Sequence, residues 1–104
     1  MVNRPFPAGA GRNEILGAFR TGLVDAAERF RPQLVMISAG FDSRAGDPLG
    51  LFTLADADFA ELTALLVDIA RQHARGRVVS VLEGGYSLRG LASAVAAHVG
   101  RLSA

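Results

Sequence analysis

Two short apolar stretches decide the fold: Leu34-Val35-Met36-Ile37 (residues 34–37) and Val78-Val79-Ser80-Val81-Leu82 (residues 78–82). Both are continuous and rich in β-branched side chains, which is typical of strands buried on both faces of a parallel sheet. Residues 38–77 separate them and include a helical pattern. Since such a helix carries the chain back along the sheet, we expect two parallel strands joined by a right-handed crossover.

Three segments with helical periodicity surround these strands. In each, apolar residues recur every three or four positions and so line one helical face. The three sets are Ile15, Phe19, Leu23, Ala27 and Phe30; Phe59, Leu62, Leu66 and Ile69; and Leu88, Leu91, Val95, Val99 and Leu102. Asn13 is expected to cap the first helix and Pro32 to end it, while Asp56 or Asp58 opens the second and Gly76 ends it.

The order helix, strand, helix, strand, helix indicates an α/β fold whose three helices can cover both faces of the sheet. A sheet of only two strands would nevertheless expose two edges, and strands of the buried type do not normally end a sheet. We therefore expect further strands beside these two, supplied by a missing N-terminal region or by another chain.

The composition excludes several classes of function. The formal net charge is +1, all basic residues are arginines, and no stretch combines basic with aromatic residues, so no nucleic-acid partner is expected. No apolar run approaches the roughly 20 residues that span a bilayer, and the N-terminus lacks the apolar core of a signal peptide, so no membrane partner is expected. The absence of cysteine is compatible with a cytoplasmic protein, and the all-arginine basic set suggests a GC-rich bacterial genome.

The chemistry-bearing residues follow the two strands. Residues 38–50 read SAGFDSRAGDPLG and residues 82–86 read LEGGY. In open α/β sheets, ligands bind outside the carboxyl ends of the strands, and neighbouring strands lie about 4.8 Å apart. Asp42 and Tyr86 are therefore expected to project into one crevice, where a carboxylate and a phenol could converge on a single ligand.

These loops, SAGFDSRAGDPLG and VLEGGYSLRGLASAV, resemble the last segment of the zinc-dependent histone deacetylase and acetylpolyamine amidohydrolase family. The stretch VNRPFPAGAG resembles the same family, so the likeness runs from about Val2 to Leu102. The resemblance implies a fragment of a three-layer α/β/α domain with a parallel sheet, the arginase-deacetylase fold. Residues 1–104 would form its C-terminal part, with the N-terminal part absent. It also implies hydrolysis of an acetyl-lysine or acetylpolyamine amide.

The resemblance assigns roles to particular residues. Asp42 matches a zinc ligand, and Tyr86 matches the catalytic residue whose hydroxyl hydrogen-bonds the scissile carbonyl. Leu49 matches a residue that lines the substrate channel, and Gly84 and Gly85 are expected to let the substrate approach closely. The chemistry suits these types: catalytic zinc takes three nitrogen or oxygen ligands and activates water, while a phenol stabilises the developing oxyanion.

The chain also departs from that family. The family's other two zinc ligands, in an aspartate-x-histidine motif, and its pair of adjacent histidines are missing here. The only histidines, His73 and His98, are isolated at helical positions and are expected to be packing residues. Since one carboxylate cannot hold a catalytic zinc, we expect the isolated chain to be inactive.

Two other functions stay open. The chain could be a non-enzymatic remnant or assembly module that needs a partner chain. A nucleotide-binding domain using Gly84 and Gly85 is weaker, because the sequence has neither lysine nor a P-loop.

The remaining loop residues are expected to be structural. Asp47 should accept hydrogen bonds from nearby backbone N–H groups of its turn, and Glu83 should bond to the neighbouring loop. Phe41 should pack, and Leu49 could belong to the core rather than to a channel.

Overall fold

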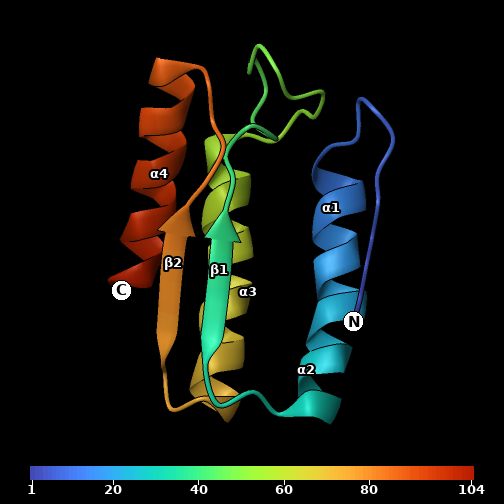
Figure 1. Cartoon of the computed structure of the whole chain (residues 1–104), viewed down its shortest axis with the longest axis vertical. Coiled ribbons are helices and arrows are strands. Elements are labelled where there is room, and N and C mark those ends of the chain that lie inside the picture. Colours follow the sequence, from blue (N-terminus) through green and yellow to red (C-terminus); the bar gives the residue numbers. More distant parts are fainter.

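The computed structural model describes all residues, 1–104. In chain order the elements are α1 (Arg12–Ala18), the π-helical turn η1 (Phe19–Leu23), α2 (Val24–Phe30), β1 (Val35–Ala39), α3 (Asp56–His73), β2 (Val78–Leu82) and α4 (Leu88–Leu102). Helices α1 and α2 with η1 between them form one continuous rod (Figure 1). The predicted order of helices and strands is therefore confirmed.

The ends of the first helix differ in detail from the prediction. Gly11, not Asn13, is the N-cap, and its N–H donates to the Glu14 carboxylate at 3.0 Å. The rod ends at Phe30, because Arg31 adopts a left-handed conformation (φ 55°) and Pro32 follows. Phe30 is 80% exposed, so it does not belong to the buried face of this helix.

The two strands pair in parallel, as predicted, with Val35 opposite Val78 and Ala39 opposite Leu82. Hydrogen bonding continues beyond the strands into the loops. The Glu83 N–H donates to the Ala39 carbonyl at 2.9 Å, and the Phe41 N–H donates to the Gly84 carbonyl at 2.8 Å. The spacing of the two loops is thus set by main-chain pairing where each loop begins.

All the helices lie on one side of the sheet or beside it, so the expectation that they cover both faces is wrong. Helices α3 and α4 pack behind the strands, and the α1–α2 rod stands beyond the free edge of β1 (Figure 1). On the other face Met36, Val79 and Val81 are 68%, 45% and 51% exposed. These strands have sequences suited to burial on both faces, but this chain covers only one.

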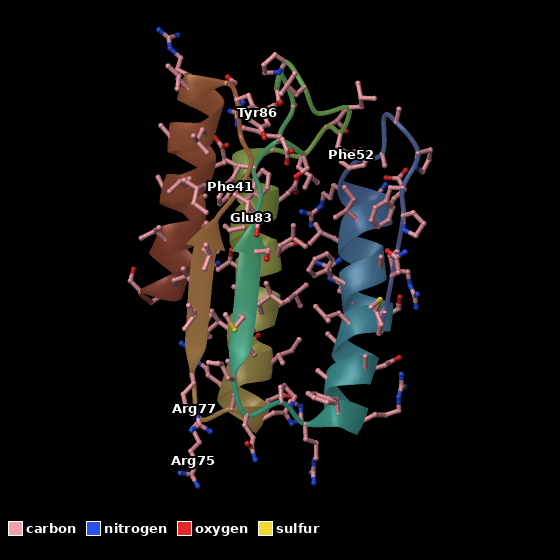
Figure 2. The ribbon with its side chains drawn as sticks, viewed as in Figure 1. Phe41, Phe52, Arg75, Arg77, Glu83 and Tyr86 are labelled. Atoms are coloured by element: carbon pink, nitrogen blue, oxygen red, sulfur yellow. The ribbon has the colours of Figure 1, made fainter.

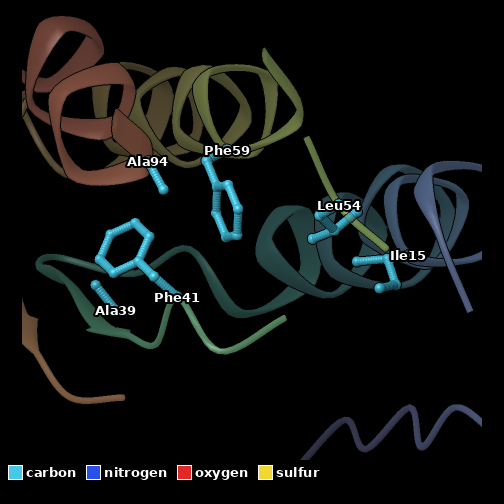
Figure 3. Packing of buried hydrophobic residues seen from close by; sticks show 6 residues of the cluster. All are labelled: Ile15, Ala39, Phe41, Leu54, Phe59 and Ala94. Carbon is cyan, nitrogen blue, oxygen red and sulfur yellow. The ribbon is translucent and has the colours of Figure 1, made fainter. Parts of the chain in front are cut away.

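The core lies between the sheet and the helices. Its central cluster is Ile15, Ala39, Phe41, Leu54, Phe59 and Ala94 (Figure 3). The rings of Phe41 and Phe59 have centroids 5.2 Å apart, which confirms that Phe41 packs. Because Phe41 directly precedes Asp42, this packing fixes the start of the first loop.

A buried polar group sits beside that core. His98 of α4 is only 6% exposed, and its Nδ1 lies 2.7 Å from the Thr63 hydroxyl. Its Nε2 lies 2.8 Å from the Ser80 hydroxyl, and its ring contacts Phe41 edge-on at 5.5 Å. The Thr63 hydroxyl donates to the Phe59 carbonyl, so it accepts from Nδ1–H, and Nε2 accepts from Ser80. His98 is therefore a neutral, satisfied packing residue, as predicted.

A hollow of about 880 Å³ follows the free edge of β1. It is lined mainly by apolar side chains, among them Ala27 of α2, Val35 of β1 and Ile69 of α3. None of the helices combines the length and the apolarity needed to cross a lipid bilayer.

Candidate functional site

The loops after β1 and β2 meet at the carboxyl end of the sheet. Figure 2 shows Tyr86 at this end, and Arg75 and Arg77 at the opposite end. The parallel pairing of the strands places both loops on the same edge, as the sequence predicted.

Asp42 lies at the base of the first loop, with its carboxylate against the second. The carboxylate borders the backbone of Gly84, two residues before Tyr86. It differs from Asp47, Asp56 and Asp58, because it accepts no hydrogen bond from this chain. No buried side-chain oxygen lacks a partner, so the Asp42 oxygens remain accessible. An accessible, unpartnered carboxylate is free to bind a ligand from outside.

Glycines surround Asp42 where any side chain would collide. A Cβ atom on Gly84 would stand 2.8 Å from Asp42 Oδ2, and one on Gly40 would stand 3.2 Å from Oδ1. A Cβ on Gly50 would overlap the main-chain carbonyl of Asp42. Gly50 therefore needs glycine for close approach, and a side chain at Gly84 would displace the Asp42 carboxylate. The role predicted for Gly84 in substrate approach stays a prediction.

Tyr86 extends from the second loop with its side chain 52% exposed. Its hydroxyl makes no hydrogen bond within the chain, whereas its backbone N–H does. Gly85, just before it, has φ +137°, and a Cβ there would come within 2.6 Å of the Leu91 side chain. Gly85 therefore serves local backbone geometry and close packing against α4, while the phenol remains free for a ligand.

Asp47 joins the two loops. Its Oδ1 accepts from the N–H groups of Leu49 and Gly50, both at 2.9 Å, as predicted for a turn carboxylate. Its Oδ2 accepts at 2.8 Å from the N–H of Tyr86, which the sequence did not reveal. Burial alone would raise the pKa of Asp47, but the backbone N–H groups of Tyr86, Gly50, Leu49 and Ser87 together outweigh it and hold that pKa below its ordinary range.

One alternative and one expectation for neighbouring residues are wrong. Leu49 is 68% exposed, which excludes the alternative that it belongs to the core, and it lies at the rim of the loop. The Glu83 side chain is exposed and makes no hydrogen bond to the neighbouring loop. Only its backbone N–H is paired, because the sheet ladder continues through it to Ala39.

Arg44 attaches the first loop to the start of α3. Its Nε lies 2.7 Å from Asp56 Oδ1, and this guanidinium holds the pKa of Asp56 below its usual range. The strand-like bridge between Arg44 and Leu54 closes the loop on itself. The first loop is therefore held at both ends and across its middle.

Taken alone, the donor set of this chain does not make a zinc site. Catalytic zinc needs three protein ligands, and no three histidine, cysteine, aspartate or glutamate side chains come together anywhere in the chain. Asp42 offers one free carboxylate of the right type. Any further ligands would have to come from residues outside these 104.

A second hollow of the chain lies elsewhere. It has a volume of about 250 Å³ and lies on the inner side of β1, lined by apolar residues including Phe6, Phe19 and Phe52. Neither Asp42 nor Tyr86 lines it. Its apolar lining suits a packing side chain or a strand better than a polar ligand, so the two loops remain the candidate site.

Sequence reasoning missed Gly40, Gly50 and the link from Asp47 to Tyr86. The glycines flank the aspartate and end the turn in the stretch from 40 to 50, so their positions were a usable signal. The Asp47 link joins residues 39 positions apart, and no local pattern announces it.

Comparisons with known proteins agree with this picture. The family profile of the histone deacetylase domain matches residues 1–102. The chain is 43% identical over 86 residues to the histone deacetylase-like amidohydrolase of Pseudomonas aeruginosa, which covers 83% of the chain and 23% of that protein. It is 45% identical over 95 residues to human polyamine deacetylase HDAC10, which covers 90% of the chain and 14% of that protein.

A solved structure shares the fold as well. The structure of the histone deacetylase Clr3 aligns with a TM-score of 0.87 and 36% identity, over 97% of this chain and 16% of the other. The chain thus spans about a quarter or less of the length of these relatives. Because the family profile covers nearly all of the sequence, the chain belongs to the histone deacetylase family.

Proposed function

We propose that this chain supplies the acid and the phenol of a zinc-dependent deacetylase site that hydrolyses acetyl-lysine or acetylpolyamine amides. The observation that carries the proposal is the free Asp42 carboxylate against Gly84, two residues from Tyr86. Membership of the histone deacetylase family supports the reaction class. The P. aeruginosa relative is named as a histone deacetylase-like amidohydrolase, which supports amide hydrolysis, and the human one as a polyamine deacetylase, which supports a polyamine substrate.

Tyr86 has the chemistry that amide hydrolysis requires. A neutral phenol donates one hydrogen bond, and the oxygen of a scissile carbonyl gains negative charge as water attacks its carbon. The Tyr86 hydroxyl has no partner in this chain and is exposed, so it is available to that oxygen. The exposed Leu49 at the rim would contact the apolar part of the substrate.

Asp42 would be one of the ligands that hold zinc, with the others supplied by residues outside this chain. Bound zinc activates water and polarises the amide carbonyl. Within the chain, Asp42 contributes a carboxylate that fits close to the backbone of Gly40 and Gly84, because neither glycine carries a side chain that would occupy that space. The 104 residues alone are therefore expected to show no turnover.

The test is a hybrid enzyme. This chain would replace the matching 86-residue segment of the P. aeruginosa relative, and turnover of an acetyl-lysine peptide and of acetylated polyamines would be measured with and without a chelator. We expect turnover that needs metal, a loss of about 10²-fold or more in Tyr86→Phe, and loss of zinc in Asp42→Asn. Asp25→Asn, on the exposed side of α2, is the matched control.

Two results would contradict the proposal. One is a Tyr86→Phe hybrid as active as its parent, which removes the phenol from the reaction. The other is an Asp42→Asn hybrid that still holds stoichiometric zinc by metal analysis. Robust turnover by the 104 residues alone would refute the dependence on outside ligands.

The second candidate function is an assembly module that needs a partner chain. The uncovered sheet face and the apolar hollow along the edge of β1 favour it. Sedimentation of the purified chain distinguishes the two: a stable monomer with cooperative unfolding argues against the need for a partner. We further propose a cytoplasmic location, which fractionation of the native host would test.

A further inference from the structure

The carboxylate of Asp47 serves two loops at once. Oδ1 binds the turn that carries Leu49, through the N–H groups of Leu49 and Gly50. Oδ2 binds the N–H of Tyr86, on the loop after the other strand. The Asp47 side chain therefore connects the backbone of Tyr86 to the backbone of Leu49.

This connection needs the ionised carboxylate. An ionised carboxylate only accepts hydrogen bonds, whereas the protonated acid turns one oxygen into a donor. Three N–H donors aimed at two oxygens favour the charged form, in keeping with the lowered pKa of Asp47. At neutral pH, both oxygens are therefore available to the two loops.

The Tyr86 main chain has few other attachments. Its N–H and carbonyl make no backbone–backbone hydrogen bond, its hydroxyl has no partner in the chain, and the residue is half exposed. The bond to Asp47 therefore sets where the Tyr86 backbone lies relative to the loop that holds Asp42. Misplacing a reacting group by about 1 Å can cost about 10²-fold in rate.

We propose that Asp47 is a positioning residue that places the Tyr86 hydroxyl over the substrate carbonyl. The inference rests on the proposed function, because it assigns Asp47 a role only through Tyr86. It adds a residue that would touch neither substrate nor metal but ties the Tyr86 backbone to the turn of the first loop, beyond the main-chain pairing at the loop bases.

Asp47→Asn breaks one side of the link selectively. The amide keeps a single accepting oxygen, and its NH₂ group cannot accept from an N–H. Since the N–H groups of Leu49 and Gly50 lie only two and three residues along the chain from residue 47, whereas Tyr86 belongs to another loop, we expect the oxygen to stay with Leu49 and Gly50. The Tyr86 N–H then loses its partner while the turn survives. Asp68→Asn, on the exposed side of α3, is the matched control.

The first measurement follows backbone amides of the full 104-residue chain by NMR during a pH titration. We expect the Tyr86, Leu49 and Gly50 amides to shift with one shared midpoint, below the ordinary aspartate value of about 3.9. Asp47→Asn should abolish that shift and speed hydrogen exchange at the Tyr86 amide about 10-fold, while Asp68→Asn should leave both unchanged. A Tyr86 amide that still titrates in Asp47→Asn would overturn the inference.

The second measurement is a double-mutant cycle in the hybrid enzyme. It tests the inference even if the isolated Asp47→Asn chain does not fold. We expect Asp47→Asn to lower kcat about 10-fold with little change in KM, and to cost less than about twofold when Tyr86 is already phenylalanine. Additive effects would refute the positioning role and leave the proposed function standing. A Tyr86→Phe hybrid with unchanged turnover would remove both together.

Discussion

Replacing His98 with leucine should destabilise the chain by an amount that its hydrogen bonds define. The leucine fills much of the same space but leaves the Ser80 hydroxyl without its partner, at a cost of about 1–3 kcal/mol. Thr63 keeps its bond to the Phe59 carbonyl, so it adds little. Loss of the edge contact with Phe41 adds about 0.5–1 kcal/mol. We expect the free energy of unfolding to fall by about 2 kcal/mol.

Urea unfolding followed by circular dichroism measures this change at neutral pH, and thermal unfolding should show a Tm lower by roughly 10 °C. The triple variant His98→Leu, Ser80→Ala, Thr63→Val supplies the control, because it removes both hydroxyls that contacted His98, including the orphaned one of Ser80. Its stability should return most of the way to that of the parent. A triple variant no more stable than the single one would show that the cost comes from packing, and the reasoning from hydrogen bonds would be wrong.

The same histidine predicts a pH dependence. Burial lowers the pKa of His98 below its ordinary value of about 6.5. At a pH between the lowered pKa of His98 in the folded chain and its ordinary value in the unfolded chain, the unfolded chain binds a proton that the folded chain does not. The free energy of unfolding therefore has its full value above about pH 6.5. It falls as the pH decreases below about 6.5, by up to ~1.4 kcal/mol per pH unit. The lowered pKa values of Asp47 and Asp56 add further losses only in more acidic solution.

Urea midpoints measured between about pH 7 and pH 5 test this slope, which should be present in the parent and in His73→Gln but absent in His98→Leu. Equal slopes in the parent and in His98→Leu would exclude His98 as the source.

Three further predictions concern the loops and the bare sheet face. Gly84→Ala should push the Asp42 carboxylate aside, because its Cβ would stand 2.8 Å from Oδ2, and zinc content of the hybrid should fall; unchanged metal binding would contradict this. Arg44→Gln should lower the free energy of unfolding by about 0.5–1 kcal/mol, less in high salt, since it removes the pair with Asp56; a salt-independent loss would indicate packing instead. Val81→Lys should weaken self-association measured by sedimentation, because it places a charge on the uncovered face; an equally associated variant would point to another surface.

Much of the fold could be predicted because its signals are local. The β-branched runs around Val35 and Val78 gave both strands, and periodic apolar residues gave the helices. Local signals did not predict which faces of the sheet the helices cover. Buried-type strands indicate that both faces are covered somewhere, but they do not say by what, and here only one face is covered within the chain.

In the candidate site, too, the features set by strand topology were predictable and those set by loop contacts were not. Asp42 and Tyr86 follow strands whose pairing was predictable, so their shared edge followed from topology. Other features depend on how two loops that are distant in sequence pack against each other. They are the exposure of Leu49, the unpaired side chain of Glu83 and the hydrogen bond between Asp47 and Tyr86. Such contacts leave no periodic trace in the sequence.

The main-chain hydrogen bonds that extend the ladder past β1 and β2 also bear on how such a site can change over time. Since main-chain groups of Ala39, Phe41, Glu83 and Gly84 hold the loop bases at a set separation, that separation does not depend on most of the neighbouring side chains. Rim residues such as Leu49 can then be exchanged without moving the acid or the phenol. Substrate preference can diversify on a framework whose reactive spacing stays the same.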